Sequence, residues 1–260
     1  MIGAHRVRGL LLLTLNLGLV GGGCETQSSG SFVEEGAEII AHDEWGATAT
    51  MRVEAIVRDP KDPDGDVYLY QLSVKDPTTG TTRPYCSPDR EGGTYAIPLS
   101  GYWDAKRNYV SNESATTFAC TNGSLAKCVR LGYKPWKTVN GVSLAEYHQA
   151  CVHLVAADYC GDGKPHTREG TKIDMWDDLG IQKRETEPGM VFEAAWSPRG
   201  AVYLNKTRYA EPLSDLVAQC PDRLTGRTSL DVPAPEPREI AERWPEVRIF
   251  TESFVRADLP

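Results

Sequence analysis

Seven cysteines constrain how this chain of 260 residues can fold more than any other feature. They are Cys24, Cys86, Cys120, Cys128, Cys151, Cys160 and Cys220. Setting aside Cys24, which stands near the start, leaves six that can pair in an oxidising compartment. We predict three intramolecular disulfides and no free thiol among these six, with the connectivity left open. Cys120 and Cys128 are the easiest local pair to close, although a helix between them would point them apart.

The N-terminus has the pattern of an export signal. Arg6 and Arg8 give a positive start without any carboxylate, and residues 10–20 form an apolar stretch that is interrupted by a few small or polar residues. As a helix this stretch would cover about 16 Å, well short of the ~30 Å hydrocarbon core of a bilayer. We therefore predict a signal peptide over residues 1–23 and no membrane-spanning helix there.

Small residues directly before Cys24 indicate how the signal is processed. The run Val-Gly-Gly-Gly-Cys ending at Cys24 resembles the lipobox of bacterial lipoproteins, although Gly21 stands where such boxes usually carry Leu. Residues 24–36 are rich in Ser and Gly and suit a flexible tether. We predict a lipid on Cys24 that anchors the protein to the cell membrane or outer membrane. The alternative is ordinary secretion, which would leave the protein periplasmic or extracellular.

The charge of the chain excludes one class of partner. The formal net charge is −8, and removal of a leader with two arginines and no carboxylate would make it −10. A surface of this sign repels phosphate backbones, so we expect no nucleic-acid partner.

Hydrophobic periodicity predicts strands in the first half of the chain. Residues 49–57 and 67–74 alternate between apolar and polar on either side of a turn rich in Asp, Pro and Gly, which predicts a hairpin. Residues 95–99 and 116–120 are expected to form further short strands. The first half is therefore predicted to be a β-sheet module.

The second half mixes helices and strands. Helical spacing predicts a short helix over 124–131 and a second helix over 144–157, with Ser143 as its N-cap. Further strands are expected at 172–176, 191–196, 201–204 and 247–255, and a short helix at 236–244. The expected class is α+β, an antiparallel β-rich domain over residues 37–260 that has a few short helices and is stabilised by disulfides. One large domain or two small ones would fit this length.

One tetrapeptide resembles a family signature. It consists of Ala157, Asp158, Tyr159 and Cys160. It looks like the motif that gives the bacterial ADYC domain its name, and we extend the likeness over about residues 86–203, because segments 126–136 and 192–196 also resemble the family. The resemblance implies an exported bacterial protein of uncharacterised role, with no settled reaction.

The segment after the signature overlays a calcium-binding loop in part. Asp158, Asp162 and Glu169 fall at the first, fifth and twelfth positions of an EF-hand loop. Cys160 occupies the third position, where an oxygen ligand is required, so we expect no calcium binding there. The alternative is a turn held by carboxylate-to-backbone hydrogen bonds. Whether residues 158–178 surround a site or cap a helix stays open.

Zinc is a second alternative. His148 and Cys151 lie three residues apart on one helix face, and Cys128 or Cys160 would complete a mixed sulfur and nitrogen site. Because oxidation consumes thiolates, we prefer a packed histidine beside a disulfide, and we predict no metal and no cofactor.

A cysteine nucleophile is the third alternative. Cys160 would attack, with His166 or His153 as the base. Asp174 would orient the base. We prefer a disulfide at Cys160, since the six cysteines can all pair.

Aromatic residues offer a fourth alternative, a carbohydrate or peptide groove. The candidates are Tyr102, Trp103, Tyr133, Trp136, Trp176 and Trp196. Aromatics of this kind are more often part of the core, because they bury a large area.

We therefore expect a non-enzymatic, lipid-anchored binding or structural domain of the cell envelope, with no catalytic residue. Its partners would be the membrane, through the N-terminal lipid, and an unknown envelope or extracellular ligand. An envelope hydrolase with a cysteine or carboxylate site is the first alternative. A calcium- or zinc-stabilised adhesion module is the second.

Overall fold

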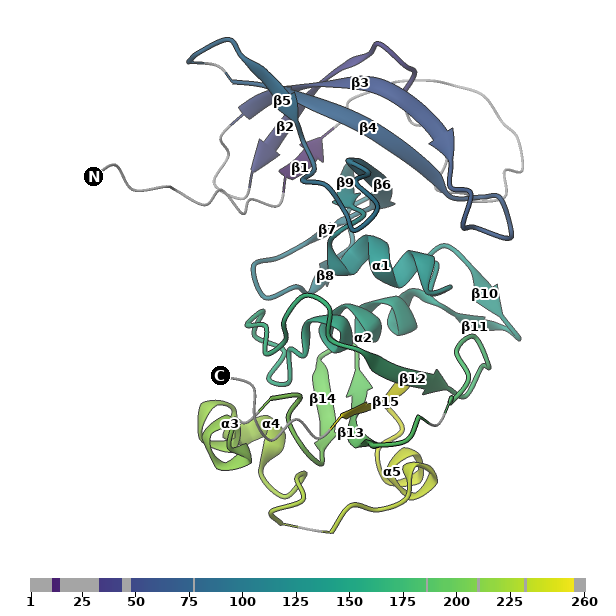
Figure 1. Cartoon of the computed structure of the whole chain (residues 1–260), viewed down its shortest axis with the longest axis vertical. Helices are drawn as coiled ribbons and strands as arrows, with labels where there is room; N and C mark the ends of the chain where they lie inside the picture. Colours follow the sequence, from purple (N-terminus) through teal and green to yellow (C-terminus); the bar gives the residue numbers. More distant parts are fainter. Residues whose placement is uncertain are drawn as a thin grey trace. The chain divides into compact units, whose positions relative to one another are not determined.

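The chain forms two compact units in a computed structural model (Figure 1). The model describes residues 11–14, 33–43, 48–76, 78–185, 187–209, 211–231 and 233–254. We call residues 1–104 with 109–126 the N-terminal unit, and residues 105–108 with 127–260 the C-terminal unit. Each unit has an antiparallel sheet and its own hydrophobic core, which confirms the expected α+β class. Cys24 lies outside the described residues.

The N-terminal unit is a closed barrel with one added strand. The strands of its main sheet are β1 (Leu11–Thr14), β2 (Glu38–Asp43), β3 (Thr48–Arg58), β4 (Tyr68–Lys75), β5 (Thr82–Pro84), β6 (Tyr95–Ser100) and β9 (Ala115–Cys120). They pair in the order β3-β2-β1-β9-β6-β4-β5, and β4 pairs with β3 as well, so the first six close on themselves. Every pair is antiparallel. Closure covers the strand edges that an open sheet would expose.

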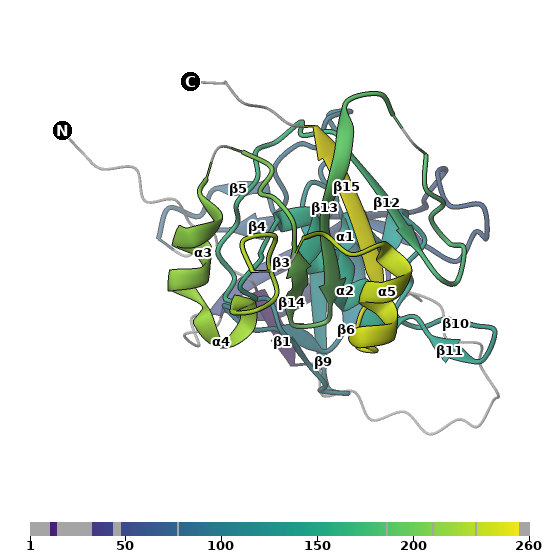
Figure 2. The same cartoon turned by 90° about the horizontal axis from the view of Figure 1, so that it is seen from below.

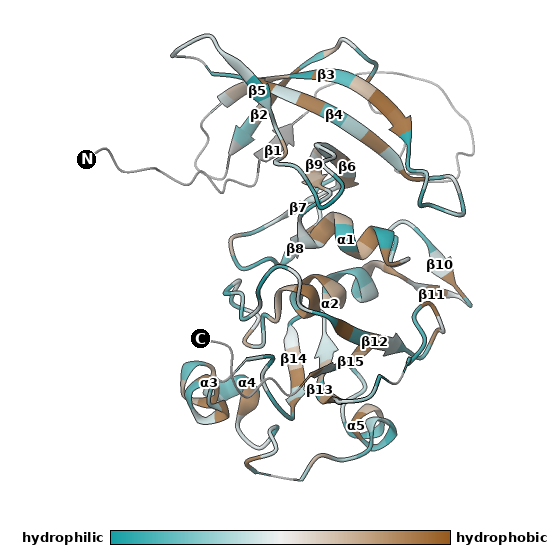
Figure 3. Cartoon of the chain, viewed as in Figure 1, coloured by the Kyte–Doolittle hydropathy of each residue, from teal (hydrophilic) through white to brown (hydrophobic). Residues whose placement is uncertain are grey.

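Alternation along the strands supplies the barrel core. β3 and β4 form the predicted hairpin, with a register shift between Val53 and Ala55, and their apolar and polar residues alternate along the ribbon in Figure 3. Side chains of one face point inward because successive residues of a strand face opposite sides. The buried cluster consists of Ile39, Ala41, Met51, Val53, Tyr70, Leu72, Val74, Cys86, Ala96 and Phe118.

The apolar leader contributes a strand that its pattern did not predict. Residues 11–14, within the expected export signal, form β1 between β2 and β9. Leu12 pairs with His42, and Leu13 pairs with Thr116. A short apolar run suits a strand as well as a helix, because periodicity alone does not separate the two. The export signal itself stays a prediction.

The C-terminal unit has a four-stranded antiparallel sheet among its described residues. The order is β12-β15-β13-β14. The strands are β12 (Ile173–Asp177), β13 (Met190–Ser197), β14 (Gly200–Leu204) and β15 (Ile249–Phe254). The helices are α2 (Ala145–Ala156), α3 (Leu213–Gln219), α4 (Pro221–Leu224) and α5 (Pro237–Arg243). α1 (Ser124–Arg130) carries the chain from the first unit into the second.

Helices cover both faces of this sheet. α2 packs along β13, β14 and β15. On the other face, Ile240 of α5 packs with Ala195 and Phe250. Figure 2 shows α5 alongside the strands from a second direction. Among the described residues, no helix is both long and apolar enough to cross a bilayer.

Two short hairpins and a helix cap complete the description. β7 (Tyr102–Trp103) pairs with β8 (Tyr109–Val110), and β10 (Thr138–Val139) pairs with β11 (Val142–Ser143). The prediction that Ser143 is the N-cap of α2 is wrong, because Leu144 holds that position, although the Ser143 hydroxyl accepts the Ala145 N–H at 3.3 Å. Ser143 instead belongs to β11.

Candidate functional site

The signature tetrapeptide begins where α2 ends. Ala157 has a left-handed backbone with φ of 50°, and its N–H donates to the Leu154 carbonyl at 2.9 Å. This conformation closes the helix and turns the chain away. A small side chain limits the steric cost of positive φ, since a larger or branched side chain would crowd the turn.

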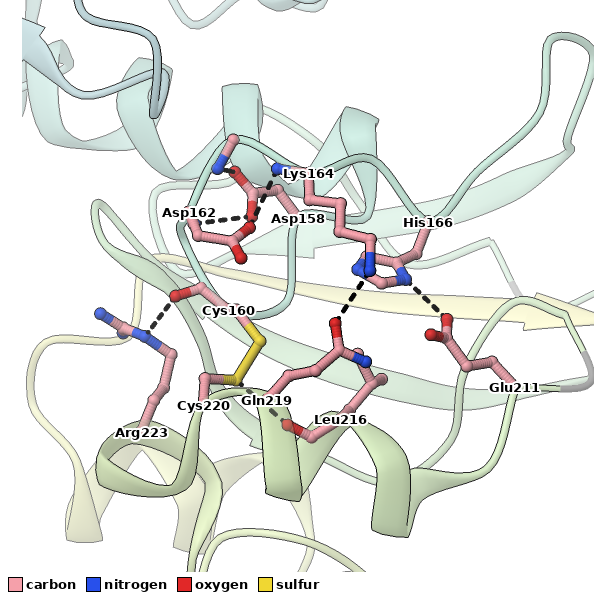
Figure 4. Close-up of a disulfide and its surroundings, with 11 residues drawn as sticks. Asp158, Cys160, Asp162, Lys164, His166, Glu211, Leu216, Gln219, Cys220 and Arg223 are labelled. Carbon is pink, nitrogen blue, oxygen red and sulfur yellow. Dashed lines mark hydrogen bonds and ion pairs between the residues drawn. A yellow bond between two sulfur atoms is a disulfide. The ribbon is translucent and has the colours of Figure 1, made fainter.

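Asp158 holds the loop that follows. Its side chain is fully buried, and its two oxygens accept the Asp162 N–H at 3.1 Å and the Gly163 N–H at 2.9 Å (Figure 4). His153 Nδ1 lies 3.0 Å from Asp158 Oδ2. This arrangement matches the expected turn held by carboxylate-to-backbone hydrogen bonds. Such bonds fill the acceptor sites that a cation would otherwise use.

The tautomer of His153 follows from its other neighbour. Gln149 Nε2 donates to the Arg107 carbonyl at 2.7 Å and lies 2.9 Å from His153 Nε2. Because an amide nitrogen can only donate, His153 Nε2 accepts and Nδ1 carries the proton toward Asp158. The buried imidazole is therefore fully hydrogen-bonded and cannot reach a substrate in solution.

Tyr159 is the centre of a buried polar clamp. Its hydroxyl donates to Glu193 Oε1 at 3.2 Å and accepts the Arg208 N–H at 3.0 Å. Burial, followed by the charge of Glu193, raises the pKa of Tyr159 well above its ordinary value. The ring stacks on Trp196, with the ring centroids 5.4 Å apart. The phenol therefore stays neutral and serves as a structural contact.

An ion pair completes the clamp. Arg208 Nε lies 3.0 Å from both carboxylate oxygens of Glu193, and both side chains are almost wholly buried. The Arg208 guanidinium also donates to the carbonyls of Leu154 and Val155 at the end of α2. Sequence reasoning missed both residues. A carboxylate within the apolar strand 191–196 was the available signal, because a buried charge requires a partner.

The described cysteines form three disulfides, as predicted. The pairs are Cys86–Cys120, Cys128–Cys151 and Cys160–Cys220, with Cα–Cα distances of 5.5, 5.8 and 5.7 Å. The prediction of a bond between Cys120 and Cys128 is wrong, because β9 ends at Cys120 and α1 begins between the two residues.

These bonds bear on the zinc and nucleophile alternatives. Cys128, Cys151 and Cys160 each have a sulfur partner, so none supplies the thiolate that either site needs. His148 is buried on α2, as expected for a packed histidine.

The other two carboxylates of the EF-hand-like segment, Asp162 and Glu169, have separate partners. Asp162 accepts the Lys164 N–H at 2.9 Å, and Glu169 pairs with Lys127 at 3.4 Å. Among the described residues, the acidic group whose ligand oxygens lie within 4.8 Å of one another is Asp62, Asp64 and Asp66, in the turn between β3 and β4. The carboxylates of Asp158, Asp162 and Glu169 therefore do not form such a group.

His166 and Asp174 lie in different parts of the C-terminal unit. His166 Nδ1 pairs with Glu211 Oε2 at 2.6 Å, and its buried Nε2 has no hydrogen-bond partner among the described residues. Asp174 lies on β12, directly opposite Glu252 of β15. The structure does not join these two residues into a triad with Cys160.

The cross-strand carboxylates form the second polar feature. Burial raises the pKa of Asp174, and the charges of Glu252 and Glu185 act in the same direction. Arg184 donates to Glu252 Oε1 and lies over the Trp176 ring at 4.7 Å, while Glu252 Oε2 is buried without a partner among the described residues. Because carboxylates with raised pKa values are common in active sites, a hydrolase with a carboxylate site stays an alternative.

The aromatic candidates divide between core and surface. Trp103, Tyr133 and Trp196 are buried. Tyr102, Trp136 and Trp176 are half-buried. The core interpretation therefore holds for half of the candidates.

Comparison with protein-family models identifies a family for this chain. The model of the ADYC domain matches residues 31–210. The chain belongs to the ADYC domain family. The match begins earlier than residue 86 and ends later than residue 203, where we expected its bounds, and therefore takes in β2 to β5 and Arg208 as well. Comparison with curated proteins and with solved structures finds no match.

Each signature residue of this ADYC domain has a structural task. Ala157 ends α2, Asp158 holds the loop, Tyr159 joins the Glu193–Arg208 pair, and Cys160 bonds to Cys220. Cys220 lies beyond residue 210, so the disulfide ties the matched region to α3 and α4. All four signature residues therefore contribute to the fold of the C-terminal unit.

Proposed function

We propose that this protein is an exported lipoprotein, anchored by Cys24, whose ADYC domain is a non-enzymatic binding or structural module of the cell envelope. The observation that carries the proposal is the complete pairing of the other six cysteines. Disulfides form and persist in oxidising compartments, and Cys24 is left over beside a short apolar leader.

The role of the signature residues supports the non-enzymatic part. Asp158, Tyr159 and His153 are fully buried and hydrogen-bonded to the chain itself. A catalytic group must reach its substrate. The residues that define the family therefore support folding, and a ligand would bind on the surface that they position.

Fractionation of cells tests the anchor. We expect the wild-type protein in the membrane fraction and Cys24→Ser in the soluble fraction, because the variant lacks the thiol that carries the lipid. Cys24→Ala should behave in the same way. A wild-type protein that is soluble, with an unmodified N-terminus by mass spectrometry, would contradict the lipoprotein assignment.

A further inference from the structure

Two arginines lie at the loop of the signature disulfide, and a third follows α4. Arg223, in α4, donates from Nε to the Cys160 carbonyl at 3.0 Å (Figure 4). Arg199 is at the tip of the β13–β14 hairpin, and its carbonyl oxygen would lie 2.0 Å from a Cβ at Gly161. The hairpin tip and α4 therefore both contact the loop at residues 160–161.

Arg227 is the third arginine, and its charge acts on Arg223. Its N–H donates to the Leu224 carbonyl at 3.0 Å, just after α4 ends. Its guanidinium lies over the Trp244 ring at 5.6 Å and pairs with Glu246 at 3.5 Å. We call Arg199, Arg223 and Arg227 the arginine cluster.

The cluster holds an excess of positive charge. Burial, followed by repulsion from Arg199 and Arg227, lowers the pKa of Arg223. Glu246 is the carboxylate that contacts the cluster among the described residues. Asp158 also acts on Arg223, but its oxygens already accept backbone N–H groups. The chain as a whole is acidic, with a formal net charge of −8, so this concentration of cations is local.

Donors remain free in the cluster. Arg223 donates only from Nε to an acceptor among the described residues, so its terminal N–H groups are available. Figure 4 shows the end of this guanidinium pointing away from the disulfide. Arg199 is exposed, and its side chain has no acceptor in the described part of the chain. A guanidinium already fixed at one nitrogen loses less freedom when it binds an anion.

We propose that the arginine cluster binds a phosphate group. Guanidinium forks match the oxygens of phosphate, and a bound anion would relieve the repulsion that Arg199 and Arg227 exert on Arg223. The ligand could be free phosphate or the headgroup of an anionic phospholipid, since both present the same oxygens. The inference goes beyond the proposed location and does not depend on lipidation.

Titration of the purified, oxidised chain with inorganic phosphate at low ionic strength tests the site. We expect saturable heat by calorimetry, a tenfold or greater loss of affinity in Arg223→Gln, and a smaller loss in Arg199→Gln. Arg199→Gln is the variant least able to disturb folding, because that side chain makes no hydrogen bond or ion pair with the described residues. Arg238→Gln is the matched control, since this exposed arginine of α5 pairs with Glu242 away from the cluster.

Vesicles identify the source of the phosphate. Cys24→Ser, which carries no lipid, should bind phosphatidylglycerol vesicles more tightly than phosphatidylcholine vesicles if the ligand is a headgroup, and Arg223→Gln should remove the difference. Phosphate binding without this preference would assign a soluble ligand. The proposal is overturned if neither probe binds in an Arg223-dependent manner, or if Arg238→Gln loses as much affinity as Arg223→Gln.

Discussion

At the scale of single residues, buried charge is the feature that most distinguishes this domain. Glu193 and Arg208 are removed from water and paired with each other, and Tyr159 and the carbonyls at the end of α2 occupy their remaining sites. A buried pair of this kind is costly to break, because the surviving charge is left without a partner.

Glu193→Gln tests the clamp. We expect a loss of about 3–5 kcal/mol in the free energy of unfolding, since the neutral amide leaves Arg208 buried and uncompensated. Urea denaturation followed by tryptophan fluorescence measures it. Glu242→Gln is the matched control, because its exposed pair with Arg238 is worth less than about 1 kcal/mol. Equal effects of the two substitutions would contradict the clamp.

Asp174→Asn tests the cross-strand carboxylates. Because the folded-state pKa of Asp174 is raised, the wild type loses stability as the pH rises from the unfolded value through the folded one. The variant cannot ionise and should be more stable than the wild type at neutral pH, by less than about 1 kcal/mol after solvent screening. The advantage should disappear below about pH 4, near the unfolded pKa. A variant that is less stable at both pH values would refute this account.

At the scale of elements, glycines allow the signature loop to meet the β13–β14 hairpin. Gly161 has φ of 67°, and Gly200 of the hairpin has φ of 110°. A Cβ on Gly161 would overlap the Arg199 carbonyl. The loop and the hairpin approach at backbone distance, which only glycine permits.

Gly161→Ala should therefore cost more than its backbone angle alone requires. Gly180→Ala is the control, since Gly180 has φ of 73° and open space around its Cα. We expect about 1–2 kcal/mol for Gly180→Ala from the left-handed conformation. Gly161→Ala should add about 1–3 kcal/mol, because a backbone segment must move. Thermal unfolding of both variants measures the difference, and equal melting temperatures would rule out the close contact.

At the scale of the whole molecule, export would change the N-terminal unit. Cleavage before Cys24 removes β1, which lies between β2 and β9 and completes the barrel. The backbone groups of β2 and β9 that face β1 would then lose their partners.

Hydrogen exchange compares the two forms of the chain. We expect faster deuterium uptake at Thr116 of β9 in a chain that starts at residue 24 than in the full-length chain, because Thr116 pairs with Leu13 of β1. Ala115 should not change, because its N–H donates to the Asn112 carbonyl at 3.1 Å. The β3–β4 hairpin, which pairs along its length, should exchange equally in both. Equal uptake in β9 would show that the barrel edge does not depend on β1.

Local structure could be predicted from the order of the residues alone. Alternation predicted the β3–β4 hairpin, helical spacing predicted α2, and the even number of cysteines beyond Cys24 predicted three disulfides. The hairpin and the helix depend on neighbouring residues, and the number of disulfides depends on the number of cysteines. None of these predictions requires knowledge of distant contacts.

Contacts between residues far apart in the sequence could not be predicted and became known from the folded structure. The pairing of Cys160 with Cys220, the burial of Glu193 against Arg208 and the closure of a barrel through β1 each join segments that no local pattern connects. The arginine cluster arises in the same way, from a hairpin tip and a short helix brought to one loop. Such contacts are set by how layers pack around a core, and the period of a single segment does not contain that information.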